Sequence, residues 1–331
     1  MTPVARIEEE RPATRDEWDE AWHACPAVTY FHSPAWAELW ARPGRARVKP
    51  EARLVRFADG VTAVLVGSRE RLHRGLTSRL VTTSSGTYGG WLAGPGAGAA
   101  HAGALAARLL REPDLWWRLN PYDPLVEAPH GVAVRPEESD ALALDGGFEA
   151  VWRRASRGHR AAANKAARAG VDVRRAASRS DWEAYYAVYQ DSLRRWREHR
   201  SWTLGYGAQL FEALRRHDPE HVQLWLAWHQ GRAVAGALCL AGPAALVYWH
   251  GATLEAAFDL RPSTLLMREI VRDACASGAA WFDFNPSAGL EGVREFKRRF
   301  GTQTLSCPVV VRQSTRTRGL RRLRGRRPDQ S

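Results

Sequence analysis

The chain has 331 residues, which is long enough for two domains. Of these residues 45% are hydrophobic and 25% are charged, as is typical of globular proteins, and the net charge is +12. Its apolar runs stay well below about eighteen residues and its first residues carry no apolar leader, so we expect neither a membrane span nor a secretory signal. The four cysteines are scattered without CxxC spacing, which argues against a disulfide framework or a zinc site and fits a reducing cytoplasm.

The first half of the chain predicts a mixed α/β domain. Thr14 and Glu17 have the spacing of a capping box, which indicates a short helix over 14–24. Ser33 as N-cap and Pro34 at the first helical position start a second helix within 31–40. A hairpin around Ala-Asp-Gly, a strand that ends in glycines, a helix, and a strand that enters a Pro-rich loop follow at 52–70, 79–94, 99–112 and 114–125.

The second half repeats this order of elements. A basic helix over 148–170 ends at Gly170. A strand, two helices, three strands, a helix, a strand, a short helix and a last strand follow at 171–176, 178–198, 203–219, 222–253, 262–278, 279–287, 289–301 and 304–312. Two similar halves indicate a duplicated α/β (α+β) fold, with domains at 1–147 and 148–312.

Much of the positive charge lies at the C-terminal end. Residues 312–331 hold eight arginines and one aspartate, and without them the net charge falls from +12 to +5. Because this segment has few apolar residues to bury, we predict a basic disordered tail over 313–331. A basic surface favours nucleic acid, nucleotides or an anionic membrane surface, although the arginines can equally serve solubility alone.

Lysine is rare in this chain. Only Lys49, Lys165 and Lys297 occur among the 48 lysines and arginines. Arginine is a planar fork that is always charged, whereas lysine is a compact charge on a flexible stem. A lysine kept inside the arginine-rich stretch EFKRRFG (295–301) therefore points to chemistry that arginine would perform less well.

Several motifs occur in a fixed order along the chain. F-H-S-P-A-W (31–36) and T-Y-G-G (87–90) lie in the first half. In the second half follow N-K-A…A-G-V, G-R-x-V-A-G-A-L and finally D-F-N-P-S…G-L…F-K-R-R-F-G. This ordered set resembles the FemABX family and the related FemAB-like branch of the GNAT superfamily, the BioF2-like acetyltransferase domain, over nearly the whole chain.

The resemblance implies two tandem GNAT-like domains with a substrate cleft between them and in the second. Characterised members move an amino acid from an aminoacyl-tRNA to an amine of a peptidoglycan stem peptide or, in antibiotic pathways, of a small peptide. They need no metal or redox cofactor, and some relatives are predicted acyl-CoA acyltransferases. Two features depart from the family. The second half has no room for the helical hairpin associated with tRNA contact, and no lysine near Trp40 is available for the phosphates of a UDP-linked acceptor.

Lys297 and Asp283 are the candidate catalytic residues. When an amine attacks an ester carbonyl, negative charge develops on the carbonyl oxygen and then on the departing ribose oxygen. Lys297 matches a lysine implicated in the family, and we predict that it stabilises this charge or binds the terminal ribose-phosphate. The alternative is a solvated lysine. Asp283 could accept or orient the proton of the amine, or only cap the next turn, and the leaving oxygen could take the proton instead.

Other residues are candidates for contact with the substrate or tRNA. Phe296 would stack on a base or fill the core. Arg298 and Arg299 would contact phosphate or solvent. Asn285 and Ser287 are expected to form a turn first and to contact a ligand second. Along the basic helix one broad side could follow a phosphate backbone or be ordinary solvated surface, and it carries Arg153, Arg157, Arg160 and, less well aligned, Lys165 and Arg168. Asn164 in the middle of this helix could hydrogen-bond a ligand or only mark an exposed turn. The resemblance places Trp36 and Tyr88 on the first-domain side of the cleft, although isolated aromatic residues are usually core.

These observations predict a cytoplasmic transferase that forms an amide bond. The expected partners are aminoacyl-tRNA as donor and, as acceptor, an amine on a small peptide, a natural-product intermediate or a peptidoglycan precursor. We expect no cofactor and no metal. An acyl-CoA-dependent N-acyltransferase is the alternative on the same fold, although residues 258–270 lack the glycines of a CoA pyrophosphate loop. A noncatalytic binding protein for tRNA or an anionic surface is the alternative of another class.

Overall fold

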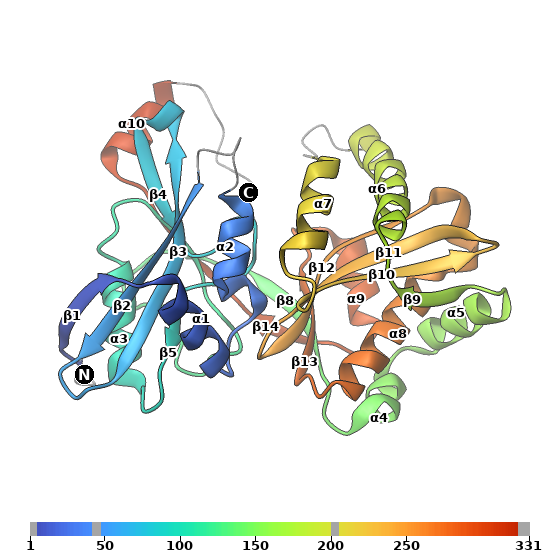
Figure 1. Ribbon diagram of the computed structural model, residues 1–331, viewed down its shortest axis with the longest axis horizontal. Coiled ribbons are helices and arrows are strands. Elements are labelled where there is room, and N and C mark those ends of the chain that lie inside the picture. The colour runs from blue at the N-terminus through green and yellow to red at the C-terminus, as the bar shows by residue number, and fades with distance from the viewer. Residues whose placement is uncertain (1–4, 42–47, 200–204, 324–331) are drawn as a thin grey trace. The chain divides into compact units, whose positions relative to one another are not determined.

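A computed structural model describes residues 5–41, 48–199 and 205–323. The chain divides into two compact units, Met1–Glu138 with Ser306–Ser331, and Ser139–Leu305. Each unit has its own β-sheet with helices packed against it (Figure 1). The α/β class predicted from the sequence is therefore observed in both units.

The first unit is built on a sheet with the strand order β1-β2-β3-β4-β6-β15-β7, and β5 pairs with β3. Neighbouring strands are antiparallel except for β4 and β6, which are parallel. Its elements are β1 (Ile7–Pro12), α1 (Arg15–Ala24), η1 (Tyr30–His32), α2 (Pro34–Trp40), β2 (Val48–Phe57), β3 (Thr62–Leu72), η2 (His73–Gly75), β4 (Thr77–Val81), β5 (Trp91–Ala93), α3 (Ala99–Leu109), β6 (Leu115–Arg118), β7 (Val134–Arg135), β15 (Val309–Arg312) and α10 (Thr315–Leu323).

The first two helices begin where their capping residues predict. The Thr14 side chain accepts a hydrogen bond from the Glu17 amide, and the Thr14 amide donates to the Glu17 carboxylate at 2.8 Å. Ser33 Oγ accepts from the Trp36 amide at 3.0 Å, with Pro34 in the first turn. The hairpin around Ala-Asp-Gly is also present, since β2 and β3 pair on either side of it. Each capping bond contributes about 1 kcal/mol to helix stability.

The single strand expected over 79–94 is instead two strands, β4 and β5, joined by an irregular segment. The backbone is left-handed at Ser85 (φ 53°) and turns to φ 141° at Gly90, and neither value fits an extended strand. Both strands still belong to the same sheet, because β4 and β5 each pair with β3.

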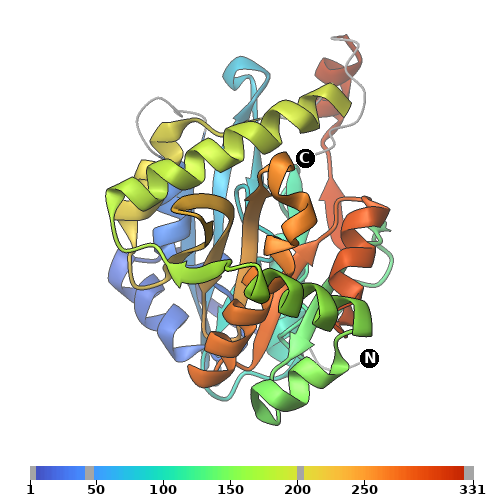
Figure 2. The same ribbon diagram turned by 90° about the vertical axis from the view of Figure 1, so that its right-hand side faces the viewer.

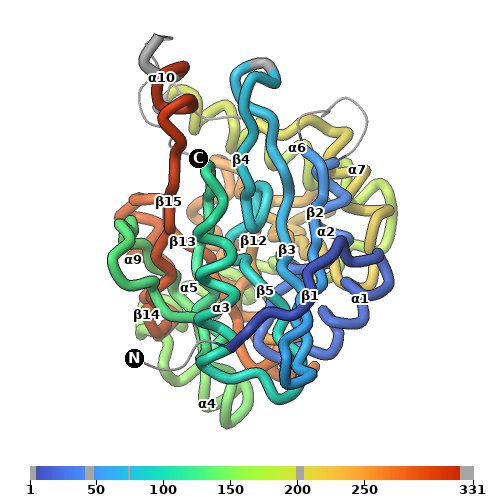
Figure 3. Tube along the Cα trace, turned by 90° about the vertical axis from the view of Figure 1, so that its left-hand side faces the viewer, coloured from blue at the N-terminus to red at the C-terminus, as the bar shows by residue number. Residues whose placement is uncertain are grey.

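The last segment of the chain belongs to the first unit, as the tube in Figure 3 shows for β15 and α10 in red. β15 pairs with β6 and β7. The buried carboxylate of Asp114 accepts hydrogen bonds from Ser314 N (2.9 Å), Ser314 Oγ (2.9 Å) and Thr317 Oγ1 (3.0 Å). The expected domain end at 312 and disordered tail from 313 are thus wrong up to Leu323, because strand pairing and buried hydrogen bonds order this segment. Residues 324–331 of the expected tail lie outside the described residues.

The second unit is built on a sheet with the strand order β14-β8-β13-β12-β11-β10-β9. Its strand β8 pairs with β13, so the expected first-domain boundary at 147 is too late. Its elements are β8 (Glu138–Ala143), α4 (Gly147–Arg154), α5 (Arg157–Arg168), β9 (Asp172–Arg175), α6 (Arg179–His199), α7 (Ala208–His217), β10 (Val222–His229), β11 (Arg232–Ala241), β12 (Ala245–Thr253), η3 (Glu255–Leu260), α8 (Pro262–Ala276), β13 (Trp281–Pro286), α9 (Glu291–Arg298) and β14 (Gln303–Ser306).

The helices α6 and α8 cover opposite faces of the second sheet. Tyr185 of α6 packs on Gly236, which is paired with Leu226. Asp273 of α8 binds Arg175, which is paired with Trp225. Because consecutive residues of a strand point to opposite faces, the two helices lie on either side of β10. Figure 2 shows the long α6, in yellow-green, running across the strands.

The central strands β12 and β13 run parallel and pair over only three residues, 245–247 with 281–283. Both strands continue past this stretch, to Thr253 and Pro286. The next link between them is a side-chain bond, in which Asn285 Nδ2 donates to Tyr248 O at 2.9 Å. The carboxyl end of β13 therefore carries polar side chains at a point where the regular ladder has stopped.

Candidate active site

Asp283 lies on β13 and is completely buried. Its Oδ1 accepts two hydrogen bonds of 2.7 Å, one from Ser139 Oγ on β8 and one from the Asn285 amide. Its Oδ2 is buried and has no hydrogen-bond partner among the described residues. One carboxylate oxygen is therefore fixed by the fold while the other keeps its capacity to accept a proton or a hydrogen bond.

Lys297 lies on α9 and is only 3% exposed. Its Nζ donates to the Asn285 carbonyl at 2.6 Å. Burial lowers the pKa of the Lys297 amine to about 8, although the nearby charges of Asp283 and Asp140 raise it. A solvated lysine is thus not what the structure shows, and the ammonium group is held in place rather than mobile on its stem.

The segment between β13 and α9 has a strained backbone. Asn285 (φ 62°) and Ala288 (φ 48°) both adopt left-handed conformations that non-glycine residues rarely take. Ser287 is 6% exposed, and its Oγ is buried without a hydrogen-bond partner among the described residues. Such strain clusters at ligand sites. Here it occurs at Asn285, whose amide donates to Asp283 and whose carbonyl accepts from Lys297.

Asp140 adds a second buried carboxylate to this region. It accepts from Thr304 Oγ1 at 3.3 Å and lies 3.7 Å from Arg298 Nε. Arg298 itself is largely exposed, so one side of its guanidinium remains in solvent. Sequence reasoning missed Ser139 and Asp140, because the strand that contains them was assigned to the first domain.

The other two residues of the F-K-R-R motif that were expected to contact substrate have structural partners. The Phe296 ring is half-buried and packs 5.2 Å from the His159 and Phe300 rings, and its carbonyl accepts from His159 Nε2 at 3.0 Å. Arg299 forms an exposed ion pair with Glu295 at 2.9 Å. His159 thereby fixes α9 against α5, which makes it a residue that positions Lys297.

The basic helix expected over 148–170 is broken at Ala155 and Ser156. Ser156 Oγ accepts from the His159 amide and starts α5 as its N-cap. The guanidinium of Arg160 donates back to the carbonyls of Arg153 and Ala155, closing the end of α4. The expected single stripe is therefore wrong, because an N-cap at Ser156 competes with a continuous helix.

The remaining residues of the expected stripe lie on the surface of α5. Arg157 and Lys165 are exposed, as is Asn164, whose Oδ1 accepts from Arg268 Nη1 at 3.3 Å. These side chains are available to a polyanion, but they form a short patch rather than a continuous track.

Trp36 and Tyr88 belong to the core of the first unit. Trp36 is 1% exposed and donates from Nε1 to Ser84 O at 3.0 Å, and Tyr88 is fully buried. Their expected place on a cleft wall is therefore wrong, since neither side chain presents a surface to a ligand.

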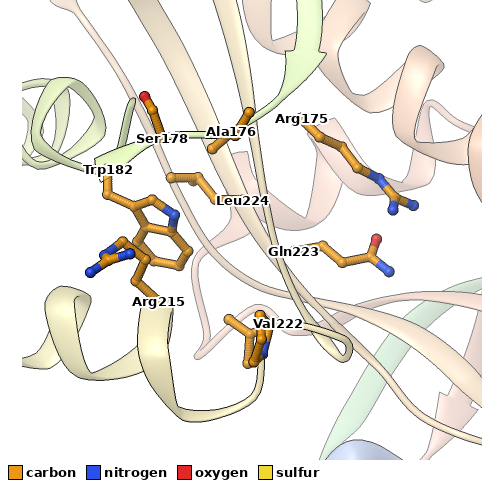
Figure 4. A pocket seen from close by; sticks show the side chains of 10 residues that line it. Arg175, Ala176, Ser178, Trp182, Arg215, Val222, Gln223 and Leu224 are labelled. Atoms are coloured by element: carbon orange, nitrogen blue, oxygen red, sulfur yellow. The ribbon is translucent and has the colours of Figure 1, made fainter. Parts of the chain in front are cut away.

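An aromatic cluster in the second unit went unnoticed in the sequence. It is formed by rings from α6, α7, β12 and the residue Tyr206 before α7, which surround His250, namely Tyr185, Tyr189, Trp196, Tyr206, Phe211 and Trp249. The signal was present as YYAVY at 185–189 and YWH at 248–250. A separate pocket of about 240 Å³ lies at the β9 edge of the sheet, between the start of β10 and Trp182 and Arg215 (Figure 4), and holds none of the expected site residues.

Two absences hold for the residues that the structure describes. No group of three or more His, Cys, Asp and Glu side chains there is arranged to hold a metal ion. None of the helices there has the length and apolar character to cross a membrane.

Comparison with known proteins gives a family for the second unit and a fold for the whole chain. Residues 153–298 match the acetyltransferase (GNAT) domain family. The second unit is thus an acyltransferase domain of the GNAT type. No curated protein matches the sequence of the chain.

Three solved structures are similar to this chain in fold. The crystal structure of FemX has a TM-score of 0.68 at 13% identity and covers 95% of this chain and 99% of FemX. A conserved protein of unknown function from Bacteroides thetaiotaomicron has a TM-score of 0.58 at 9% identity, and the match covers 93% of this chain and 100% of that protein. The C-terminal domain of a putative lysylphosphatidylglycerol synthetase from Agrobacterium fabrum has a TM-score of 0.55 at 12% identity, covering 92% and 94%. The expected pair of GNAT-like domains and the resemblance to the FemABX branch are confirmed at the level of fold.

Proposed function

We propose that the chain is an aminoacyltransferase that moves an amino acid from aminoacyl-tRNA onto an amine and so forms an amide bond. The observation that carries the proposal is the buried pair of Lys297 and Asp283 at the end of β13. The one hydrogen bond of the Lys297 amine is to Asn285 O, no carboxylate of the described residues lies within ion-pair distance of it, and Asp283 Oδ2 is unpartnered. Buried charges without full partners are costly and favour a site that a substrate completes.

The chemistry assigned to this pair is charge stabilisation and proton handling. The amine nitrogen attacks the ester carbonyl carbon, the bond from that carbon to the ribose oxygen breaks, and the ribose oxygen leaves. The Lys297 ammonium stabilises the negative charge that forms on these oxygens, a contribution of about 3–4 kcal/mol for one well-placed donor. The proton released by the amine passes to Asp283 Oδ2 or directly to the leaving oxygen, and no cofactor is needed for either route.

The preference for tRNA over acyl-CoA rests on the start of α8. Residues 258–270 contain no glycine, and the helix begins with Arg261 in a left-handed conformation (φ 58°) followed by Pro262. The match to an acetyltransferase family favours the acyl-CoA-dependent N-acyltransferase as the second candidate. A noncatalytic binding protein would not require buried, partly unpartnered catalytic groups.

For the acceptor, we infer a specialised small amine, on a peptide or natural-product intermediate, ahead of a peptidoglycan precursor. The sequence around Trp40, residues 31–48, contains no lysine to hold nucleotide phosphates. The consecutive helices α6 and α7 of the second unit have 21 and 10 residues, too unequal for a long antiparallel arm. Both features distinguish this chain from the peptidoglycan-bridge members of the FemABX family that it resembles.

The decisive experiment is to detect the amide product by mass spectrometry. The purified chain is incubated with charged total tRNA and, in parallel, with acyl-CoA, each with a panel of peptide and murein-precursor amines. A product from tRNA that disappears after ribonuclease treatment supports the proposal and identifies the amino acid. A product formed only with acyl-CoA overturns the donor and retains the acyltransferase, and salt-dependent tRNA binding without any product favours the binding protein.

A further inference from the structure

His250 is enclosed by aromatic side chains on the α6 face of the second sheet. Ring centroids lie 4.8 Å away for Tyr189, 5.7 Å for Trp249, 5.8 Å for Phe211, 5.9 Å for Tyr185 and Tyr206, and 6.5 Å for Trp196. His250 and several of these rings are only half-buried, so the cluster reaches the surface of the unit. Polar recognition in such a place depends on the two ring nitrogens of His250.

The hydrogen bond to Tyr185 determines which nitrogen of His250 carries the proton. Tyr185 Oη lies 2.6 Å from His250 Nδ1, and Tyr185 is fully buried. Within the described residues this nitrogen is the one acceptor available to the Tyr185 hydroxyl. A buried hydroxyl without an acceptor would cost about 1–3 kcal/mol, so Tyr185 donates and Nδ1 accepts. The proton of the neutral imidazole then resides on Nε2.

The second nitrogen of His250 is available to a ligand. Nε2 has no hydrogen-bond partner among the described residues, and it is not among their buried unsatisfied atoms. Burial lowers the pKa of His250 to about 4, which keeps the imidazole uncharged near neutral pH. His250 is therefore a neutral N–H donor surrounded by apolar surface.

The fold holds this donor in one orientation. Gly236 lies directly beneath Tyr185, where a Cβ atom would be 2.3 Å from the tyrosine ring, so only glycine lets Tyr185 approach the sheet this closely. Ser192 Oγ on α6 both donates to Thr253 O (3.0 Å) and accepts from Thr253 N (3.2 Å), which ties the end of β12 to the helix. Close packing and hydrogen bonds between α6 and β12 thus hold the aromatic cluster in a fixed arrangement.

The cluster is continuous with the candidate active site along β12. Two residues before His250, the Tyr248 carbonyl accepts the hydrogen bond from Asn285, whose own carbonyl accepts from Lys297 at 2.6 Å. His250 and the Asp283–Lys297 pair therefore belong to the same unit and are connected through the backbone of β12 and Asn285.

We propose that His250 binds a carbonyl oxygen of the substrate through Nε2–H, and that the surrounding rings select an apolar or aromatic side chain next to that carbonyl. A neutral donor in an apolar setting suits an uncharged oxygen that gains negative charge during reaction. The assignment of this oxygen to the transferred aminoacyl group rests on the proposed function. His250 donates a hydrogen bond throughout and neither gains nor loses a proton.

The first test reads the tautomer directly. Long-range ¹⁵N–¹H correlation spectra of the full chain, labelled at histidine and assigned with the H250Q variant, distinguish the two tautomers. We expect His250 to show the Nε2–H form, and the Y185F variant to lose this preference. A wild-type spectrum with the proton on Nδ1 would overturn the proposal.

The second test measures recognition without catalysis. N-acetyl-phenylalaninamide and N-acetylglycinamide are titrated into the full chain, and we expect the aromatic probe to bind at least tenfold more tightly. Replacing His250 by leucine should weaken its binding about tenfold, H250Q should restore part of the loss because glutamine retains a donor, and Y186F should change it less than twofold. Tyr186 is the matched control because its ring contacts Tyr189 and Phe211 but not His250.

The outcomes of this test separate the inference from the proposed function. Equal binding of the two probes, or equal losses in the H250L and Y186F variants, would overturn the inference even if aminoacyl transfer is observed. Selective binding that depends on His250 would support the inference even if no donor yields a product. Where transfer is observed, the H250L variant should lower kcat/KM about 100-fold, the usual loss for one oxyanion donor.

Discussion

The two units differ in how completely their buried charged side chains are paired. In the first unit, Glu10 is contacted by Arg53 and by Arg108 (2.7 Å), and Glu112 binds Arg69 (2.8 Å) and Arg108 (3.3 Å). Each of these two carboxylates faces two guanidinium groups. In the second unit, Asp283 and Lys297 are more deeply buried, yet each retains bonding capacity that the described residues do not use.

The difference shows which charges stabilise the fold and which await a substrate. Paired arginines and glutamates at the half-buried surface of a sheet hold neighbouring elements together. A buried carboxylate and amine that are incompletely paired cost folding free energy, and such groups occur mainly where chemistry requires them. Three variants test this contrast, in order of expected effect.

The largest effect is expected for Lys297. Replacing it by methionine keeps the side-chain volume and removes the charge, and we expect kcat to fall about 1000-fold because the charge on the transition-state oxygens loses its donor. The matched control is K49M, which alters another of the rare lysines at an exposed position of β2 and should change kcat less than twofold. Comparable losses in both variants would argue against a special role for the buried lysine.

The same residue predicts a dependence of stability on pH. The pKa of Lys297 is about 8 in the folded chain against an ordinary value of 10.5, mainly because of burial. Between these values the unfolded chain holds a proton that the folded chain lacks, so the free energy of unfolding rises with pH, by about 3 kcal/mol in total.

Urea denaturation of the wild type and K297M across this pH range measures that rise. The variant contains the same buried tyrosines and cysteines, so their titration cancels in the difference between the two curves. Parallel curves would show that Lys297 titrates at its ordinary pKa.

A smaller effect is expected in the first unit. Burial alone would raise the pKa of Glu10, but hydrogen bonds from Arg108 and Arg53 outweigh it and lower the pKa. This stabilisation is present above the ordinary pKa of glutamate and is lost as the pH falls through the lowered value. We expect E10Q to cost about 1–2 kcal/mol of unfolding free energy at neutral pH and to leave kcat unchanged. The neighbouring E9Q, at an exposed position, is the control for both measurements.

The smallest effect is expected where the basic helix breaks. S156A removes the N-cap of α5, and thermal or urea unfolding should show a loss of about 1 kcal/mol. Catalysis should be reduced only if the altered helix lets His159 release α9, since His159 bonds the Phe296 carbonyl. A variant as stable as the wild type would mean that α4 and α5 can join into the continuous helix that the sequence suggested.

Local signals predicted much of the fold. The capping box at Thr14, the Ser33-Pro34 start, the hairpin before Thr62 and the three strands over 222–253 are all present. The motif F-K-R-R-F-G also predicted Lys297 as a catalytic candidate, and the strand over 279–287 predicted Asp283 as another. These features depend on residues close together in the chain, which is why sequence patterns identify them.

Features that depend on long-range pairing were missed. The partner of Asp283 is Ser139, 144 residues away, and nothing near either residue announces the contact. The split of the last strand into β14 and β15 has the same origin, because one half pairs with β8 and the other with β6. The Tyr185–His250 bond joins a helix to a strand 65 residues later. Trp36 and Tyr88 were placed wrongly for a different reason. Aromatic side chains occur both in cores and on cleft walls, and only the packing of the first unit shows that these two are buried.

The return of β15 to the first sheet has a consequence for biosynthesis. β15 lies between β6 and β7, so the sheet that starts at Ile7 is complete only when residues 309–312 have been made. By then the whole of Ser139–Leu305 has already been synthesised, and this unit contains its own sheet. The unit that is synthesised second is thus the one able to fold first, and the earlier unit waits with an open gap between β6 and β7. Domains usually fold in the order of their synthesis. In this chain the interleaved connectivity reverses that order, and the domain that carries Lys297 and Asp283 is finished before its neighbour.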